Sequence, residues 1–147
     1  MINNDKKFLR SAIKQSKLSV EQGRFPAGAI LVLNGEVIAS EMSDTDSGYE
    51  HAECRAVDTA FQKVGKLTNT TLYASMEPCL MCLGRAYWAG IRKIVFAISR
   101  NSVPKEYYEG LHDNNELMDS FNEKIELIHL SELEEEAIKV VRMWNQV

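Results

Sequence analysis

The sequence has no long apolar run, and this absence argues against a membrane-spanning protein. No stretch approaches the ~20 apolar residues that a transmembrane helix needs. Basic residues are scattered between Lys6 and Lys17 without an apolar core, so this stretch does not resemble a secretory signal. No internal repeat or low-complexity segment is visible in the 147 residues. We therefore expect one globular domain over residues 1–147 and no membrane partner.

Cysteine and positive charge are also scarce. The chain has three cysteines, too few for a disulfide framework, so the reducing cytoplasm is the expected location. Its formal net charge of −4 argues against a nucleic acid as partner, because phosphate contacts dominate the affinity for a large polyanion. One basic stripe is interpreted as a solvated outer helix face, with a nucleic-acid contact as the alternative. The stripe consists of Lys7, Arg10, Lys14 and Lys17.

Hydrophobic periodicity predicts strands that alternate with helices, which is typical of an α/β domain with a sheet covered on both faces. Helices are predicted over residues 4–22, 51–64 and 79–89 and from the Ser131/Glu134 capping box to about residue 145. Strands are predicted over residues 27–33, 36–39, 70–74, 93–98 and 124–130. Asn34-Gly35 is a type I′ hairpin signal. Residues 40–50 are predicted to be a loop, and residues 99–115 a long functional loop with a helical turn as an alternative for part of it.

The stretch Pro78-Cys79-Leu80-Met81-Cys82 carries the most specific chemical signal. Cys-x-x-Cys places two thiols on one turn of backbone, a spacing that suits a single tetrahedral metal ion. Pro78 is typical of a helix start, and the positive end of a helix that begins there favours thiolate over thiol. His51 can supply a third ligand, and three protein ligands leave one position of a catalytic zinc open for water. The sequence therefore predicts a Zn²⁺ site at His51, Cys79 and Cys82.

Glu53 indicates which reaction such a zinc site could support. Residues two apart do not share a face of an ideal helix, so His51 and Glu53 reach one metal only if it lies off the first turn. Zinc lowers the pKa of a bound water to roughly 7, and Glu53 is close enough to accept the proton. We therefore expect Glu53 to be the catalytic group and not a ligand.

His51-Ala52-Glu53 followed by Pro78-Cys79-x-x-Cys82 resembles the zinc deaminase signature of the cytidine deaminase-like superfamily. The resemblance implies a three-layer α/β/α fold with a mixed five-stranded sheet, and a homodimer. It also implies hydrolytic deamination of a small heterocyclic amine, a guanine-type or cytosine-type free nucleobase or nucleoside, by zinc hydroxide with Glu53 as proton shuttle. Leu72-Tyr73, Glu77-Pro78-Cys79 and Gly84 resemble the branch of guanine, fungal-type cytosine and tRNA adenosine deaminases, and Tyr87-Trp88-Ala89 is most similar to bacterial guanine deaminases.

The resemblance also implies a substrate pocket. Ala27 lies in a segment similar to the P-x-G-A main-chain lining of the family's base pocket, and the backbone near Ala52 would help to orient the base. The aromatic rings at 107 and 108 could stack on a flat heterocycle. The predicted substrate-binding residues are Ala27, Ala52, Pro78, Trp88, Tyr107, Tyr108 and Asp113. Where the branch carries an Asn that reads the base, this chain has Glu41-Met42-Ser43-Asp44, so base recognition must differ.

Several alternatives remain open from the residues alone. Cys54 stands three residues after His51, so a closed Cys₃His structural zinc is possible, as is a metal-free Cys-x-x-Cys redox pair. The alternative functions are a tRNA adenosine deaminase and, from another class, a zinc-stabilised binding domain without turnover. The tRNA enzymes of the family typically end in a basic helix, whereas this chain ends in residues 142–147, Arg-Met-Trp-Asn-Gln-Val.

Overall fold

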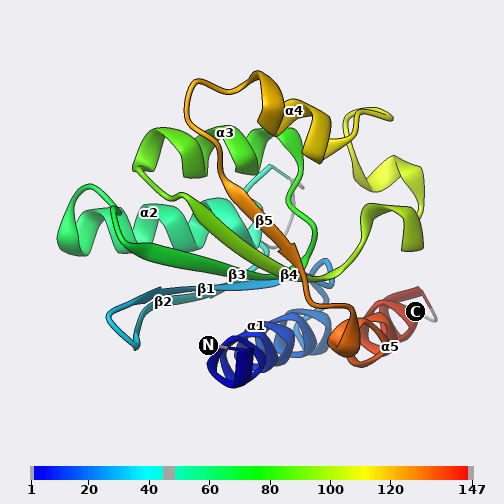
Figure 1. The fold of residues 1–147 in the computed structure, drawn as a ribbon. Helices are drawn as coiled ribbons and strands as arrows, with labels where there is room; N and C mark the ends of the chain where they lie inside the picture. The colour runs from blue at the N-terminus through cyan, green and yellow to red at the C-terminus, as the bar shows by residue number, and fades with distance from the viewer. Residues whose placement is uncertain (1, 45–48, 146–147) are drawn as a thin grey trace.

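The computed structural model, which describes residues 2–44 and 49–145, is a sheet between two layers of helices (Figure 1). The strands are β1 (Gly28–Leu33), β2 (Glu36–Met42), β3 (Thr70–Met76), β4 (Lys93–Ile98) and β5 (Glu126–His129). The helices are α1 (Ile2–Glu21), α2 (Ala52–Val64), α3 (Leu80–Ala89), α4 (Asn114–Ser120) and α5 (Glu134–Asn145). None of these helices is a candidate for a membrane span.

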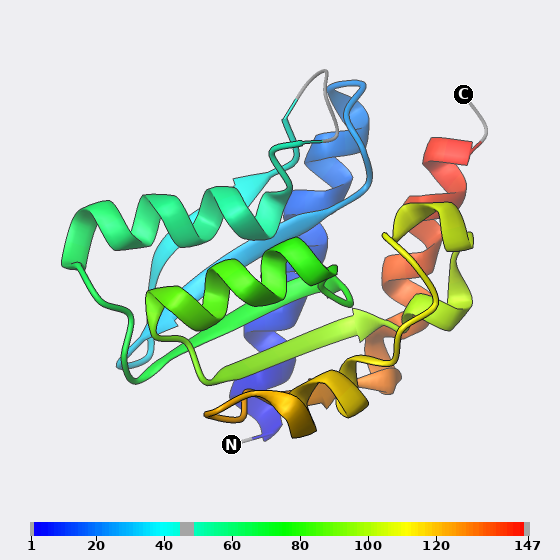
Figure 2. The same cartoon turned by 90° about the horizontal axis from the view of Figure 1, so that it is seen from above.

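The sheet is mixed and has the strand order β2-β1-β3-β4-β5. β1 pairs antiparallel with both β2 and β3, whereas the pairs β3–β4 and β4–β5 are parallel. Helices α2, α3 and α4 cover one face, and α1 and α5 cover the other (Figure 1). Seen from above, α2 and α3 lie side by side across the sheet (Figure 2). The predicted three-layer fold with a five-stranded mixed sheet is confirmed within the described residues.

Side chains of the central strands divide the core into two parts. Leu31 of β1 packs into the cluster beneath α2 and α3, while its neighbours Ile30 and Val32 pack into the cluster against α1 and α5. This alternation follows from the two-residue period of a strand. The β1–β2 turn also forms as predicted, since Asn34 and Gly35 have φ angles of 52° and 79°. A sheet buried on both faces holds the strand ends, and therefore the helix starts that follow them, in fixed positions.

The predicted boundaries are wrong at several places. β2 extends to Met42 and β3 to Met76, because both strands keep their pairing partners beyond the predicted ends. The predicted loop 40–50 therefore begins inside β2, and its residues 45–48 lie outside the described part of the chain. The predicted loop 99–115 contains two 3₁₀ turns and the start of α4, whose N-cap is Asp113. Helix α4 was not predicted.

The predicted Ser131/Glu134 capping box is wrong as well. A 3₁₀ turn over Ser131–Leu133 precedes α5, and Leu130 is its N-cap. The Glu134 carboxylate instead accepts hydrogen bonds from the Ser99 N–H at 2.8 Å and the Ser102 hydroxyl at 3.2 Å. These hydrogen bonds connect the residues after β4 to the start of α5. The Glu134 side chain therefore makes a tertiary contact in place of the predicted local cap.

Gly28 is the point of closest approach between β1 and α1. A Cβ atom there would lie 2.3 Å from the Ala12 carbonyl oxygen and 2.4 Å from the Ser16 nitrogen. Gly28→Ala is expected to destabilise the fold by at least the roughly 1–3 kcal/mol typical of overpacking, measured by denaturant unfolding. Gly84→Ala is the control, because a Cβ there meets nothing within 4 Å and Ala favours a helix interior by about 1 kcal/mol. Equal stabilities of the two variants would contradict the steric argument.

Candidate metal centre and active site

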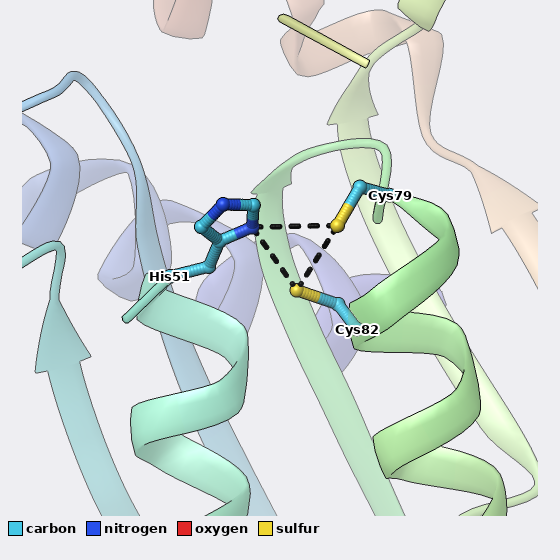
Figure 3. Close-up of side chains that lie close together, drawn as sticks. All are labelled: His51, Cys79 and Cys82. Atoms are coloured by element: carbon cyan, nitrogen blue, oxygen red, sulfur yellow. Dashed lines mark hydrogen bonds between the residues drawn. The ribbon is translucent and has the colours of Figure 1, made fainter. Parts of the chain in front are cut away.

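Two helix starts bring His51, Cys79 and Cys82 together (Figure 3). His51 is the N-cap of α2, Cys79 is the N-cap of α3, and Cys82 lies in the first turn of α3. The His51 Nδ1 atom lies 3.3 Å from Cys79 Sγ and 3.4 Å from Cys82 Sγ, and the two sulfur atoms are 3.5 Å apart. The structure therefore brings the three predicted ligands into one small triangle.

This triangle suits a tetrahedral zinc ion. Zn–S bonds of 2.3 Å and a Zn–N bond of 2.0–2.1 Å would place the donor atoms roughly 3.5–3.8 Å apart, close to the observed spacing. Two thiolates and an imidazole are also the donors that zinc prefers. The Cys82 thiol and His51 lower the pKa of Cys79 to about 5, so one thiolate forms readily. Within the described residues, the group that could hold a metal consists of these three side chains and no carboxylate.

Glu53 lies beside this group without belonging to it. It stands in the first turn of α2, is buried, and lines the same cavity as His51 and Cys79. Burial, and then the nearby Cys79 thiolate, raise the pKa of Glu53 to about 7; a bound divalent ion would oppose this shift. A carboxyl group that can gain and lose a proton near neutral pH is suited to general acid–base chemistry.

The cavity over these residues has a volume of about 370 Å³, and four aromatic residues form part of its wall. Phe25 packs edge-on against Tyr107 at 4.9 Å and against Trp144 at 6.2 Å between ring centroids. The Tyr108 hydroxyl donates a 2.7 Å hydrogen bond to the Glu77 carbonyl oxygen, which holds this ring near the cysteines. The cavity is lined by Phe25, Ala27, Ser43, Asp44, Glu50, His51, Glu53, Met76, Glu77, Cys79, Glu106, Tyr107, Tyr108 and Trp144.

Three of the predicted substrate-binding residues line this cavity, namely Ala27, Tyr107 and Tyr108. Ala52 and Pro78 do not line it, although each is adjacent in the chain to a cavity residue and is buried. Ala52 packs into the hydrophobic core beneath α2 and α3.

The structure places the other two predicted residues away from the cavity. Trp88 is 83% exposed and lies with Phe61 on the outer surface of α2 and α3. Since a helix rises roughly 1.5 Å per residue, Trp88 lies at the opposite end of α3 from Cys79. Asp113 caps α4 through the N–H groups of residues 115 and 116 and lines a neighbouring cavity. Helix geometry in one case and a local capping role in the other explain the difference.

Several cavity residues escaped the sequence analysis. Asp44, Glu50 and Glu106 line the cavity as carboxylates, and Trp144 reaches it from the end of α5. Asp44 belongs to the segment 41–44 noted in the sequence, but was not predicted to line the cavity, and the other three belong to no recognisable motif. An aromatic residue in the last turn of an amphipathic helix is the one available signal, and that signal does not say which surface the ring covers.

Replacement of Cys54 tests whether the zinc has three protein ligands and an open position, or four protein ligands. Its Sγ lies 3.5 Å from Cys82 Sγ, yet Cys54 is not in the group of three ligands. Cys54→Ser is therefore expected to keep one zinc per chain and most of the activity, measured by metal analysis and product release on one preparation. Zinc loss as large as in Cys79→Ser would instead favour a closed four-ligand site.

The chain is similar to known zinc deaminases in sequence and in fold. The family model of the cytidine and deoxycytidylate deaminase zinc-binding region matches residues 2–98. A tRNA-specific adenosine deaminase of Bacillus subtilis is 37% identical over 100 residues, which are 65% of this chain and 62% of that protein. A probable cytosine deaminase of Schizosaccharomyces pombe is 39% identical over 104 residues, 69% of this chain and 64% of that one. Each match spans less than two thirds of the relative's own length.

A solved structure extends the likeness of the fold beyond the matched region. A guanine deaminase from Nitrosomonas europaea superposes with a TM-score of 0.78 at 21% identity, and the alignment covers 95% of this chain and 84% of that one. At this identity the likeness concerns the fold alone. The three relatives carry names with three different substrates, so similarity by itself does not select one.

Proposed function

Because the chain belongs to the cytidine and deoxycytidylate deaminase family, we propose that it is an enzyme that hydrolytically deaminates a small heterocyclic amine. The family region is zinc-binding, and zinc is the cofactor; we assign His51, Cys79 and Cys82 as its ligands. The observation that carries the proposal is Glu53, a buried carboxyl group that lines a cavity together with two of these ligands. A metal site that only stabilised a binding domain would have no use for it.

The proposed reaction exchanges the amino group of a ring amidine for the oxygen of water and releases ammonia. Zinc, when bound, supplies a water molecule that is acidic enough to react near neutral pH. The Glu53 carboxylate accepts a proton from this water and delivers it to the ring nitrogen next to the reacting carbon. Glu53 then passes the second proton of the water to the departing amine, so that the products are the ring carbonyl compound and ammonia. Phe25, Tyr107 and Trp144 would hold the flat ring in place.

The preferred substrate is a free nucleobase or nucleoside of the guanine or cytosine type. The small cavity with four aromatic residues in its wall supports this choice, because ring stacking recognises a flat heterocycle without requiring a polymer around it. The second candidate is deamination of adenosine in tRNA, which the name of the Bacillus subtilis relative favours. A zinc-stabilised binding domain without turnover is the alternative from another class.

Ammonia release over a substrate panel tests the proposal. The panel contains cytosine, guanine, adenine, their nucleosides, pterins and a tRNA anticodon stem-loop, each with zinc-loaded and zinc-free protein. We expect zinc-dependent turnover of a base or nucleoside. Turnover of the stem-loop alone would favour the tRNA reaction, and a zinc-loaded chain that binds these compounds without releasing ammonia would support the binding domain.

The assembly and the location of the protein stay predictions. The resemblance to the superfamily favours a homodimer, which sedimentation of the purified chain would test. The scarcity of cysteine favours the cytoplasm, which fractionation of cells that express the full chain would test.

A further inference from the structure

Acidic side chains, and no Lys or Arg, occur in the described wall of the active-site cavity. Its described lining includes five carboxylates and neither Lys nor Arg, although the chain contains 17 basic residues. The undescribed residues 45–48 read Thr-Asp-Ser-Gly and add no basic residue to the sequence. The five carboxylates belong to Asp44, Glu50, Glu53, Glu77 and Glu106.

Arginine side chains close to the cavity lining are directed at main-chain carbonyl groups. Arg100 also lies over the Tyr108 ring, at 4.5 Å from its centroid. None of the three arginines in question lines the cavity in the described part of the chain. The bonds run from Arg24 Nη1 to the Ser43 oxygen at 3.2 Å, from Arg55 Nη1 to the Met42 oxygen at 3.0 Å and from Arg100 Nη2 to the Gly110 oxygen. A substrate in the cavity would therefore face carboxylates and the proposed zinc ion, with neither Lys nor Arg in the described lining.

Two of the five carboxylates already have tasks. Glu53 is the proposed proton shuttle, and Glu77 accepts hydrogen bonds from the Arg100 N–H at 3.0 Å and from Asn114 Nδ2 at 2.7 Å. Glu50 and Glu106, here called the outer carboxylates, also line the cavity and are the groups that we consider for contact with the substrate. Asp44 lines the cavity as well, and its N–H donates a 3.1 Å hydrogen bond to the main-chain oxygen of Glu50.

An ionised carboxylate accepts hydrogen bonds and cannot donate them. A ligand surface that faces several carboxylates is therefore favoured when it carries N–H donors or positive charge, and disfavoured when it carries a phosphate. In the segment Glu41-Met42-Ser43-Asp44, Asp44 contributes the carboxylate that lines the cavity, whereas Glu41 pairs with Arg55 at 3.5 Å outside it.

Resting on the proposed deaminase function, we propose that the outer carboxylates Glu50 and Glu106 are specificity determinants of the site. They select heterocycles that carry no phosphate and that present N–H donors or a positive charge in addition to the amino group that is released. Nucleotides and tRNA are excluded by the same charges. The substrate class is an amino-rich or cationic heterocycle, as a free base or a nucleoside.

Two matched pairs of compounds test this inference on the zinc-loaded chain. The first pair is a nucleoside and its 5′-monophosphate, for both cytidine and guanosine; the second is 2,6-diaminopurine and adenine, which differ by one amino group. We expect kcat/KM to favour the nucleoside and the diamino compound by at least about tenfold each, as polar recognition allows. Added salt should raise kcat/KM for the monophosphate, because it screens the repulsion.

The variants Glu50→Gln and Glu106→Gln should each reduce both preferences several-fold, mainly through KM. Glu116→Gln is the control, because this exposed side chain on α4 gives the same change in net charge outside the cavity. Equal kcat/KM for nucleoside and monophosphate, faster turnover of a tRNA stem-loop, or equal effects of Glu116→Gln and Glu106→Gln would overturn the inference.

Dissociation constants keep this inference separate from the proposed function. They are measured for the same pairs on the zinc-loaded Glu53→Gln chain, in which turnover is not needed. A retained preference in binding, with no ammonia from any compound on the unmodified chain, would contradict the deaminase proposal and leave the specificity intact. A ratio of dissociation constants near one, or no binding of the diamino compound, would overturn the specificity itself.

Discussion

Replacing Cys82 with Ser is expected to abolish zinc binding and ammonia release together, and Cys79→Ser should behave in the same way. Each substitution removes one of three donor atoms that lie 3.3–3.5 Å apart, and a hydroxyl group does not replace a thiolate on zinc. The loss of metal affinity should exceed the ~10–100-fold that follows removal of a hydrogen-bond partner of a ligand. Zinc per chain and ammonia release are measured on the same preparation.

Two comparisons make this result specific. Cys54→Ser removes a buried thiol at the same place in the fold and should keep the metal, so a general loss of packing cannot account for the difference. Full activity in a zinc-free preparation of the unmodified chain would contradict the metal-dependent reaction as a whole.

The elements around the metal group could be predicted because their signals are local. Asn34-Gly35 specifies its turn, and the two clusters at 51–53 and 78–82 each stand where a helix begins. The prediction erred by one residue at both helices, since His51 and Cys79 are N-caps and not first helical residues. This difference matters for chemistry, because an N-cap side chain projects from the helix end, where two such ends can meet.

The remaining features depend on contacts between residues far apart in the sequence. Glu134 forms hydrogen bonds with Ser99, 35 residues earlier, so a local capping pattern predicted the wrong partner. Trp144 lines the cavity and packs against the Phe25 ring. The hydrophobic pattern of α5 does not specify this contact. Trp88 shows the reverse case, because the predicted helix 79–89 already places it near the end of the helix that is remote from Cys79, and the resemblance of its sequence neighbours to a family motif was given more weight.

Replacing Glu53 with Gln should abolish turnover while the fold and the zinc remain. Gln keeps the size of the side chain but cannot accept the proton that the proposed reaction transfers. Ammonia release should fall by at least the ~10²–10⁴-fold typical of losing a general acid–base group. Because burial raises the pKa of Glu53 to about 7, its ionised form is disfavoured in the folded metal-free chain. At pH values above the pKa that Glu53 has in the unfolded chain, the neutral amide should therefore not lower the melting temperature of the metal-free chain.

Zinc content, melting temperature and ammonia release on one preparation separate the roles that Glu53 could have. Glu50→Gln is the matched control, since Glu50 lines the same cavity and its replacement should change KM more than kcat. Lost zinc in Glu53→Gln would mean that Glu53 is a metal ligand, and a large fall in melting temperature would mean that it has a structural role. Retained zinc with retained turnover would rule out the proton shuttle. Retained zinc and fold with lost turnover is the result that the buried carboxyl group beside His51 and Cys79 leads us to expect.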